Sequence, residues 1–267
     1  MNIQNRNPKI SIIIAVYNGS DTMQACIDSV IGQKYTNKEL IIIDGGSDDG
    51  TIELIRSYDN YIAYWVSEPD RGIYDAWNKG LERSSGEWIC FLGSDDSLAT
   101  CETLSKMVNI LIQDKTIDFL SGKARLFNKD GKLKRIKGLP WQWSQFKRFM
   151  GVIVHPGALH CIRLFNYYGK FDTNYQIAGD YEFLLRAGPE LNAKFIPEIV
   201  VNMSISGSSS RFPFKTCYEA FIIQKKSKYI GLFDAYINLI FILIKYYAGK
   251  IKYDLFWFLL KNSEQEK

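Results

Sequence analysis

Four short apolar runs, separated by segments with helical periodicity, constrain the fold of this chain more than any other feature. The runs are residues 10–16, 39–44, 61–66 and 87–92. Short runs rich in β-branched residues are typical of strands that are buried on both faces of a sheet. In the first intervening segment, Met23, Ile27 and Val30 recur at helical spacing, and Gly32 ends the pattern. This alternation predicts an α/β fold whose sheet is mainly parallel over residues 10–92.

The second half of the chain is less periodic. The expected elements are a strand within residues 115–127, a hairpin turn at Asp130 and Gly131, an irregular or helical connection at residues 139–150, and a strand at residues 195–203. From Tyr218 onward the pattern is helical and increasingly apolar. We therefore predict one α/β domain over residues 1–215, followed by a C-terminal helical extension over residues 216–267.

Composition and cysteine usage indicate a globular protein of a reducing compartment. The 267 residues are 46% hydrophobic and 23% charged, which is ordinary for a globular protein. The net charge of +4 is too small to indicate nucleic acid binding, although basic residues gather between Lys129 and Arg148. Five cysteines without paired spacing favour buried thiols over disulfides or zinc. Because the N-terminus is polar and has no signal-peptide core, we expect a cytoplasmic protein.

Two adjacent acids, Asp95 and Asp96, follow the fourth apolar run after Gly93 and Ser94. In open α/β sheets, ligands bind in the crevice at the carboxyl ends of the strands. Adjacent carboxylates repel each other unless a cation or hydrogen-bond donors hold them, and hard oxygen ligands suit Mg²⁺ or Mn²⁺. A solvated turn explains the pair alone equally well. The metal-site interpretation therefore depends on the other acids expected at the same edge.

Asp44 ends the second run and is a candidate for recognising a nucleobase. Its carboxylate could accept an N–H group of uracil or guanine, and the following Gly45 and Gly46 leave room for a ring. The first turn, residues 17–21, lacks the glycine-rich pattern of a dinucleotide fold, and the chain has no Walker-type lysine motif. The charge of a bound diphosphate would then be neutralised by a metal ion at the acid pair.

Taken together, these residues resemble the family 2 glycosyltransferases of GT-A fold. The resemblance is carried, in order and spacing, by residues 10–18, 42–51, 72–80 and 94–96. The string from Glu68 to Gly80 further resembles the bacterial surface-polysaccharide branch, including colanic-acid-type transferases. The resemblance implies a GT-A (Rossmann-like) sheet flanked by helices, a nucleotide-sugar donor, Mg²⁺ or Mn²⁺, and inversion at the anomeric carbon. It also favours a saccharide acceptor that is linked to a lipid.

The resemblance assigns the residues of the donor and metal sites. The donor-side candidates are Val16, Asn18, Asp44, Arg71, Asn78, Ser94 and Asp95, and the metal candidates are Asp95 and Asp96. Two positions depart from the family pattern, because Gly45 stands where a second acid is usual and Gly93 replaces the first acid of the Asp-x-Asp motif. Base and ribose contacts are therefore expected from Asp44 and the backbone, and Asp95 is the first choice as metal ligand.

Direct displacement of a nucleoside diphosphate requires a base that removes the proton of the acceptor hydroxyl. Asp180 begins an amphipathic helical segment and takes the place of the family's catalytic aspartate. An aspartate there would also suit the N-cap of a helix. Gly179 stands where the family has a partner acid, so Glu182 is expected to orient the acceptor instead.

Two further segments are candidates for completing the site. His155 is expected to line the acceptor side, although a lone histidine is often a structural hydrogen-bonding residue. Ser208 and Arg211 lie in a serine-rich stretch that could close over a diphosphate, and a plain surface loop is the alternative.

The apolar C-terminal segment raises the question of membrane contact. Its longest charge-free stretch, residues 235–244, would rise about 15 Å as a helix, whereas a bilayer core is about 30 Å thick. Lys245, Lys250 and Trp257 are spaced as in a helix that lies on an anionic membrane. Helices that pack on the domain or on another subunit are an equal alternative.

We hypothesise that the protein moves one sugar from a nucleotide diphosphate sugar to a saccharide acceptor at the inner face of the cell membrane. A nucleotidyltransferase with the same sheet would be expected to carry a glycine-rich basic loop after the first strand, which residues 17–20 do not form. A non-catalytic, nucleotide-sugar-binding assembly partner is the alternative from another class. Slow hydrolysis of the donor would separate an enzyme from such a partner.

Overall fold

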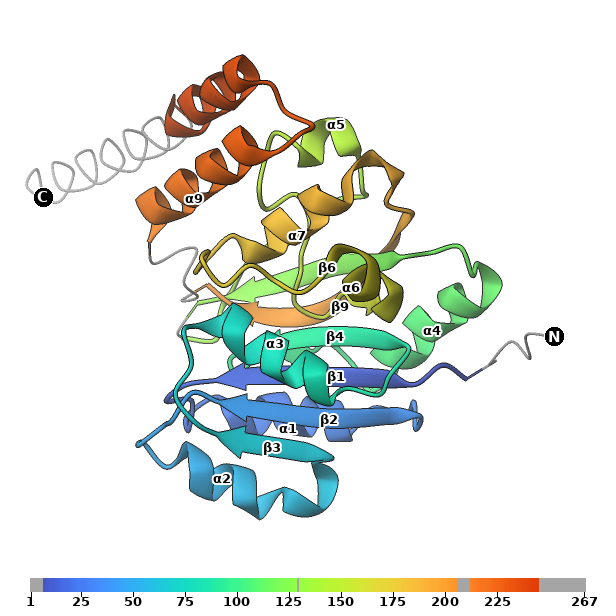
Figure 1. Cartoon of the computed structure of the whole chain (residues 1–267). Coiled ribbons are helices and arrows are strands. Elements are labelled where there is room, and N and C mark those ends of the chain that lie inside the picture. The colour runs from blue at the N-terminus through green and yellow to red at the C-terminus, as the bar shows by residue number, and fades with distance from the viewer. Residues whose placement is uncertain (1–6, 129, 206–211, 245–267) are drawn as a thin grey trace, which may run out of the picture.

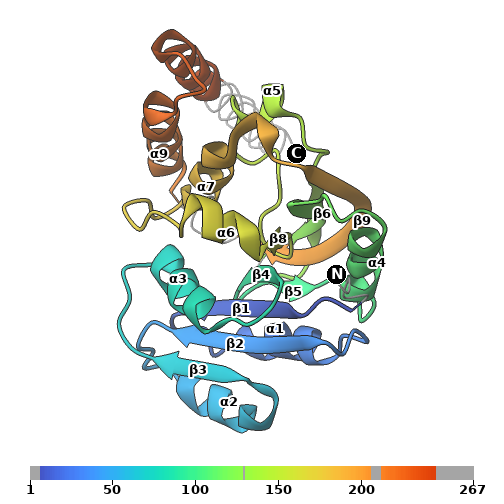
Figure 2. The ribbon, with the colours of Figure 1, turned by 45° about the vertical axis from the view of Figure 1, so that its right-hand side comes forward.

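A mixed β-sheet forms the centre of the molecule, and helices pack on both of its faces (Figures 1 and 2). The computed structural model describes residues 7–128, 130–205 and 212–244. Within these residues the sheet has nine strands in the order β3-β2-β1-β4-β8-β6-β9-β5, with β7 paired to β6. The expected α/β architecture with a mainly parallel sheet is confirmed.

The first half of the chain forms the parallel part of the sheet. Its elements are β1 (Ile10–Val16), α1 (Met23–Ile31), β2 (Lys38–Asp44), α2 (Thr51–Ser57), the 3-10 helix η1 (Asp59–Tyr61), β3 (Tyr64–Ser67), α3 (Ile73–Arg83) and β4 (Trp88–Gly93). β1 pairs in parallel with β2 and β4, and β2 pairs in parallel with β3. The third strand begins later than predicted because η1 occupies the start of the expected run.

The second half completes the sheet with mostly antiparallel pairings. Its elements are β5 (Ser97–Leu98), α4 (Thr103–Gln113), β6 (Phe119–Phe127), β7 (Leu133–Lys137), α5 (Trp143–Phe146), β8 (Leu159–Cys161), α6 (Ile162–Tyr168), α7 (Gly179–Ala187), the 3-10 helix η2 (Gly188–Glu190), β9 (Ala193–Ser204) and α9 (Pro213–Lys226). Another helix follows at residues 232–244. The predicted hairpin turn joins β6 to β7, and Gly131 has a φ of 71° there.

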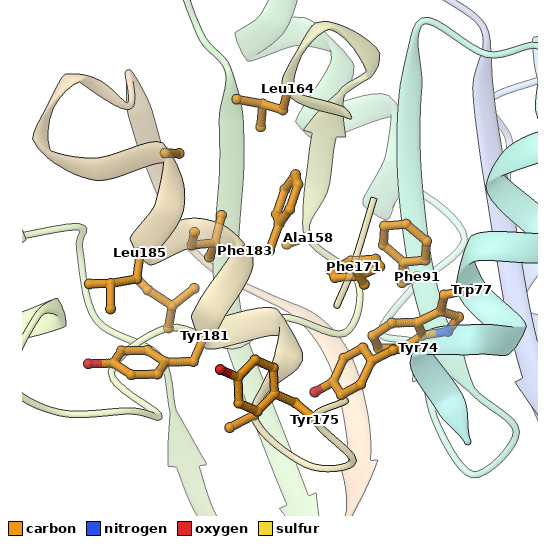
Figure 3. Close-up of a cluster of buried hydrophobic side chains, with 14 of the residues drawn as sticks. Tyr74, Trp77, Phe91, Ala158, Leu164, Phe171, Tyr175, Tyr181, Phe183 and Leu185 are labelled. Carbon is orange, nitrogen blue, oxygen red and sulfur yellow. The ribbon is translucent and has the colours of Figure 1, made fainter. Parts of the chain in front are cut away.

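The two faces of the parallel strands are covered by different helices. Along β1, Ile13 and Ala15 belong to one core cluster with residues of α3, α6 and α7. Ile12 and Ile14 belong to a second cluster with residues of α1 and α4. Figure 3 shows the aromatic part of the first cluster. Because both faces are buried, consecutive positions of each strand are apolar, which explains the uninterrupted runs in the sequence.

The C-terminal helices pack onto the rest of the domain. Ala220 and Ile223 of α9, and Ala235 of the next helix, are buried in the first core cluster. The helix at residues 232–244 also exposes apolar side chains, with Phe233 78% exposed. In the part of the chain that the structure describes, no helix combines the length and the apolar character needed to cross a membrane. The basic and aromatic residues expected at a membrane surface beyond residue 244 lie outside the described residues.

The close contact between α3 and β1 makes Gly80 a test of the packing. A Cβ atom on Gly80 would lie 2.4 Å from Cγ2 of Ile13. Alanine normally stabilises a helix interior relative to glycine by about 1 kcal/mol. At this contact we expect Gly80→Ala to lower the free energy of unfolding instead, by about 1–3 kcal/mol, because the added methyl group overpacks the core. Urea denaturation measures the change, and a variant as stable as the wild type would contradict the packing described.

Candidate active site

One cavity brings together three of the acids that the sequence singled out. The cavity has a volume of about 290 Å³ and is lined by Asp95 and Asp96, which follow β4, and by Asp180 near the start of α7. Tyr74 of α3 and Lys137 of β7 also line it. Carboxylates that are distant in the sequence therefore face a common space at the carboxyl end of β4.

The acid pair after β4 lies in an environment that disfavours two negative charges. Asp96 is buried and its carboxylate accepts a hydrogen bond of 2.8 Å from the N–H group of Gly93. Burial, and then the charge of Asp95, raise the pKa of Asp96 to about 8. Asp95 is open to solvent, yet the surrounding protein displaces enough water to raise the pKa of its carboxyl group as well. A divalent cation beside the pair would stabilise both charged forms.

The chemistry of the pair suits a metal ion that is shared with a diphosphate. Mg²⁺ is commonly held by one or two carboxylates together with substrate phosphates, rather than by a complete set of protein ligands. Among the described residues, no group of three or more acidic, histidine or cysteine side chains could hold a metal ion. A Cβ atom at Gly93 would lie 3.1 Å from Oδ1 of Asp95 and 3.2 Å from Oδ2 of Asp96. The two carboxylates therefore border the space that a side chain at position 93 would enter.

Asp180 lies inside α7, whose N-cap residue is Ala178, so the alternative N-cap role is not observed. Its Oδ1 accepts a hydrogen bond of 2.8 Å from the N–H group of Tyr181 and lies 3.1 Å from the hydroxyl of Tyr74. Burial raises the pKa of Asp180, and the Tyr181 N–H group, the Tyr74 hydroxyl and the charge of Lys137 act in the opposite direction. A carboxylate with a raised pKa is better matched to proton abstraction near neutral pH.

Tyr74 is a site residue that the sequence did not reveal. A Cβ atom on Gly179 would lie 2.8 Å from two carbons of the Tyr74 ring, so this ring fills the space beside position 179. Its hydroxyl lies 2.8 Å from the carbonyl oxygen of Ile177 and donates its single proton either there or to Asp180. In the sequence Tyr74 is one apolar residue of α3. The only signal for its position was Gly179, which lies beside the Tyr74 ring in the structure.

Glu219 of α9 supports the segment that leads to Asp180. Its carboxylate accepts hydrogen bonds from the N–H groups of Gln176, Ile177 and Ala178, the last two at 2.8 and 2.9 Å. These donors immediately precede α7 and would otherwise require other partners. The C-terminal helix therefore fixes the backbone beside the candidate base.

His155 lines the cavity in an apolar setting, and its predicted place on the acceptor side stays a prediction. Its ring stacks on Trp77 and on Phe91, with centroid distances of 5.3 and 5.8 Å. Neither ring nitrogen has a hydrogen-bond partner among the described residues. Burial lowers the pKa of His155 to about 3, so the ring is neutral at pH 7. A polar group of a ligand in the cavity would satisfy a nitrogen that the protein leaves unpaired.

Asp44 uses its carboxylate to hold its own loop. It is fully buried and accepts hydrogen bonds from the N–H groups of Gly46 and Ser47, at 3.1 and 2.9 Å. It also accepts hydrogen bonds from the hydroxyls of Ser47 and Ser67. Oδ2 accepts three of these four hydrogen bonds, and Oδ1 accepts only the one from the Ser47 hydroxyl. Because Asp44 is fully buried and holds its own loop, recognition of the base by its carboxylate stays a prediction.

Two donor-side candidates lie at the end of β1 and the adjoining loops. Val16 is buried at the end of β1, and its carbonyl oxygen accepts the N–H group of Gly45. Asn18 adopts a positive φ of 49°, and its side-chain oxygen accepts the N–H group of Asp48 at 3.1 Å. These residues position the backbone at this edge of the sheet.

The other donor-side candidates, Ser94, Asn78 and Arg71, do not line the cavity. Ser94 immediately precedes the acid pair. Asn78 is paired through its side chain with both backbone groups of Phe171. Arg71 is exposed and forms a surface ion pair of 3.1 Å with Asp75. Neither Asn78 nor Arg71 lines the cavity.

Among the remaining candidates, only the acceptor residue Glu182 lies within the described residues. Glu182 forms an ion pair of 2.7 Å with Arg186 along α7 and does not line the cavity. Ser208 and Arg211 lie outside the described residues. The acceptor-orienting role predicted for Glu182 therefore has no support from its position.

Comparison with known proteins shows which family the chain belongs to. The model of the family described as Glycosyl transferase family 2 matches residues 11–170, more than half of the chain. The chain belongs to glycosyl transferase family 2. An uncharacterized glycosyltransferase of Mycobacterium tuberculosis is 33% identical over 184 residues, which cover 67% of this chain and 69% of that protein. The protein is thus a glycosyltransferase by family.

Solved structures of other glycosyltransferases have the same fold. The mannosyltransferase PcManGT from Pyrobaculum calidifontis, in complex with GDP-Man and Mn²⁺, has a TM-score of 0.65 and 18% identity, covering 87% of this chain and 70% of that chain. S. aureus TarS in complex with UDP-GlcNAc has a TM-score of 0.61 and 17% identity, covering 88% of this chain and 71% of that chain. At these identities the likeness shows the GT-A fold alone.

The buried His155 predicts how stability depends on pH. Its pKa in the folded protein is about 3, below the ordinary value of about 6.5, so the unfolded chain binds more protons as the pH falls. The contribution of the neutral His155 ring to stability is fully present above the unfolded pKa. It is lost progressively as the pH falls toward the folded pKa. His155→Phe removes this loss. When the pH is lowered from 7 to 5, the free energy of unfolding of the variant should therefore rise by about 2 kcal/mol relative to that of the wild type. Denaturation curves at both pH values test this, and a constant difference between the two proteins would refute it.

Proposed function

We propose that the protein is an inverting glycosyltransferase that moves a sugar from a nucleotide diphosphate sugar to a hydroxyl of a saccharide acceptor. The observation that carries the proposal is the single cavity lined by Asp95, Asp96 and Asp180. Family membership supports glycosyl transfer. The structural neighbours bound to GDP-Man with Mn²⁺ and to UDP-GlcNAc support a nucleotide-sugar donor.

The arrangement of the acids suits a direct displacement. Asp180 accepts the proton of the acceptor hydroxyl while the hydroxyl oxygen forms a bond to the anomeric carbon. The bond from that carbon to the diphosphate breaks, and its electron pair leaves with the nucleoside diphosphate. Asp95 and Asp96 would hold Mg²⁺ or Mn²⁺, which neutralises charge on the diphosphate when bound. Attack from the face opposite the leaving group inverts the anomeric configuration.

The proposed acceptor is a lipid-linked saccharide, as in the assembly of a bacterial surface polysaccharide. The resemblance of residues 68–80 to that branch supports this class of acceptor. Apolar side chains exposed on the helix at residues 232–244 support contact with a membrane surface: Leu232, Phe233, Tyr236, Ile237, Ile240 and Ile244. In this proposal, residues 1–215 carry the catalytic site and residues 216–267 bring it to the inner face of the membrane.

Asp180→Asn tests the proposed base. Since a general base contributes about 10²–10⁴-fold to a rate, we expect kcat to fall by about that factor. Donor affinity should stay nearly unchanged, because the proton transfer involves the acceptor. The donor is first chosen by thermal stabilisation with UDP-, GDP- and TDP-sugars and Mn²⁺. Donor binding is then measured by calorimetry, and transfer is measured with a bacterial lipid extract as acceptor.

Asp172→Asn provides the matched control, because Asp172 precedes the same helix but does not line the cavity. It should retain wild-type transfer. Lost donor affinity with retained turnover in the Asp180→Asn variant would refute the role of this residue. Donor binding by the wild type, without transfer or donor hydrolysis, would favour a non-catalytic partner instead.

The surroundings of Asp180 predict the pH dependence of transfer. Because the base must be deprotonated and its pKa is raised by burial, kcat should fall with decreasing pH at a higher pH than an ordinary aspartate would give. Lys137 lowers the pKa of Asp180, so Lys137→Met should move the acidic limb of the profile to higher pH. Lys134→Met, on the same strand but outside the cavity, should leave the limb in place. Profiles are measured with saturating donor and Mn²⁺, and coincident limbs for wild type and Lys137→Met would contradict the assignment.

A further inference from the structure

A carboxylate from the loop after β3 fills the space beside Gly45. A Cβ atom on Gly45 would lie 2.8 Å from Oδ2 of Asp70 and 3.4 Å from Cδ2 of Tyr17. Gly45 directly follows β2, Tyr17 directly follows β1, and Asp70 follows β3. Three neighbouring strand ends thus converge on one small region in which a glycine leaves room for the acid of another loop.

We propose that Asp70 is the residue that recognises the nucleobase of the donor, and that the base is uracil or thymine. In this arrangement Oδ2 of Asp70 accepts the imide N–H group, and the base lies beside Gly45 and the ring of Tyr17. The inference rests on the proposed function, because it assumes a nucleotide-sugar donor. It assigns to Asp70 the role that the sequence predicted for Asp44, whose carboxylate is fully buried and holds its own loop.

The region of Gly45 and the acid pair lie on the same edge of the sheet. The strand order is β3-β2-β1-β4, so the ends of β2 and β4 are two strand spacings apart, about 10 Å. A ribose and two phosphates can cover a span of this size. The loop after β1 connects the two regions, because a Cβ atom on Gly19 would lie 2.8 Å from Oγ of Ser94, next to Asp95.

The carboxylate of Asp70 is held in place but keeps one oxygen available. Its Oδ1 accepts the N–H group of Gly72 at 2.8 Å. Its Oδ2 has no hydrogen-bond partner among residues 7–128, 130–205 and 212–244. Lys79 steadies the loop through an ion pair of 2.9 Å with Glu68 and a hydrogen bond to the carbonyl of Pro69. Burial raises the pKa of Asp70, as expected for a carboxylate without a direct cationic partner.

Tyr17 supplies a surface on which a base can stack. Its side chain is 67% exposed, although it follows a fully buried strand. An exposed aromatic ring offers a flat face to a planar group, and base–aromatic stacking tolerates any base. Stacking therefore adds affinity, whereas Asp70 discriminates between bases.

The single available oxygen favours one class of base. Uracil and thymine present one imide N–H group between two carbonyl groups, which one carboxylate oxygen can accept. Guanine presents two adjacent donors that suit a carboxylate with both oxygens available. Cytosine has an acceptor nitrogen at the corresponding position and would be repelled by a carboxylate. We therefore expect UDP or TDP to bind more tightly than GDP, and much more tightly than CDP.

Calorimetric titration of UDP, TDP, GDP and CDP in the presence of Mn²⁺ tests the inference with wild-type protein and Asp70→Asn. A hydrogen bond to a charged group is worth about ten- to hundred-fold in affinity, so Asp70→Asn should weaken UDP or TDP binding by that factor. The preference over CDP should disappear, because an amide can offer an N–H group to cytosine. Glu53→Gln, an equal change of charge at an exposed position of α2, should retain both affinity and preference.

A double variant distinguishes recognition from loop support. In Gly45→Asp combined with Asp70→Ala, the new acid has room and should restore the preference for UDP or TDP over CDP. Unchanged affinity and preference in Asp70→Asn, or tighter binding of GDP by the wild type, would overturn the role of Asp70 while leaving the glycosyltransferase proposal intact. Failure of every nucleoside diphosphate to bind the wild type would overturn both.

Discussion

The parallel pairing of β1 with β2 and β4 is the constraint on which the rest of the structure depends. Parallel strands require crossover helices on the faces of the sheet, and burial of both faces makes the strands apolar throughout. Polar residues can then occur only where the strands end. Because all parallel strands end at the same edge, the topology of the sheet alone brings together the loops that carry Tyr17, Gly45, Asp70 and Asp95.

The parts of the fold that could be predicted from sequence are those in which local pattern and tertiary burial agree. β1, β2 and β4 contain long apolar runs and are followed by polar turns, so their type and order could be inferred. β5 and β8 are two and three residues long, and their pairing partners are remote in the sequence. No periodicity can be detected over so few residues, and only packing determines these strands.

The candidate site was predictable to a similar extent. Asp95, Asp96 and Asp180 could be found because each is an acid next to an apolar element. The placement of Tyr74 and Asp70 could not be predicted, because each fills the volume left open by a glycine elsewhere in the chain. The hydrogen bonding of Asp44 was also hidden, since Ser67, which donates to it, belongs to another strand. Acids can be located from sequence, but whether their oxygens are already occupied is decided by tertiary contacts.

Glu219 accepts hydrogen bonds from three main-chain N–H groups, and these bonds connect two regions that a domain boundary would separate. The match to the family model ends at residue 170, whereas Asp180 and Glu219 both lie beyond it. A shortened protein that stops before α9 would lose the acceptor for three main-chain donors and expose the apolar side of α7. The region matched by the family model therefore lacks both residues, and any minimal version of the enzyme has to retain α9.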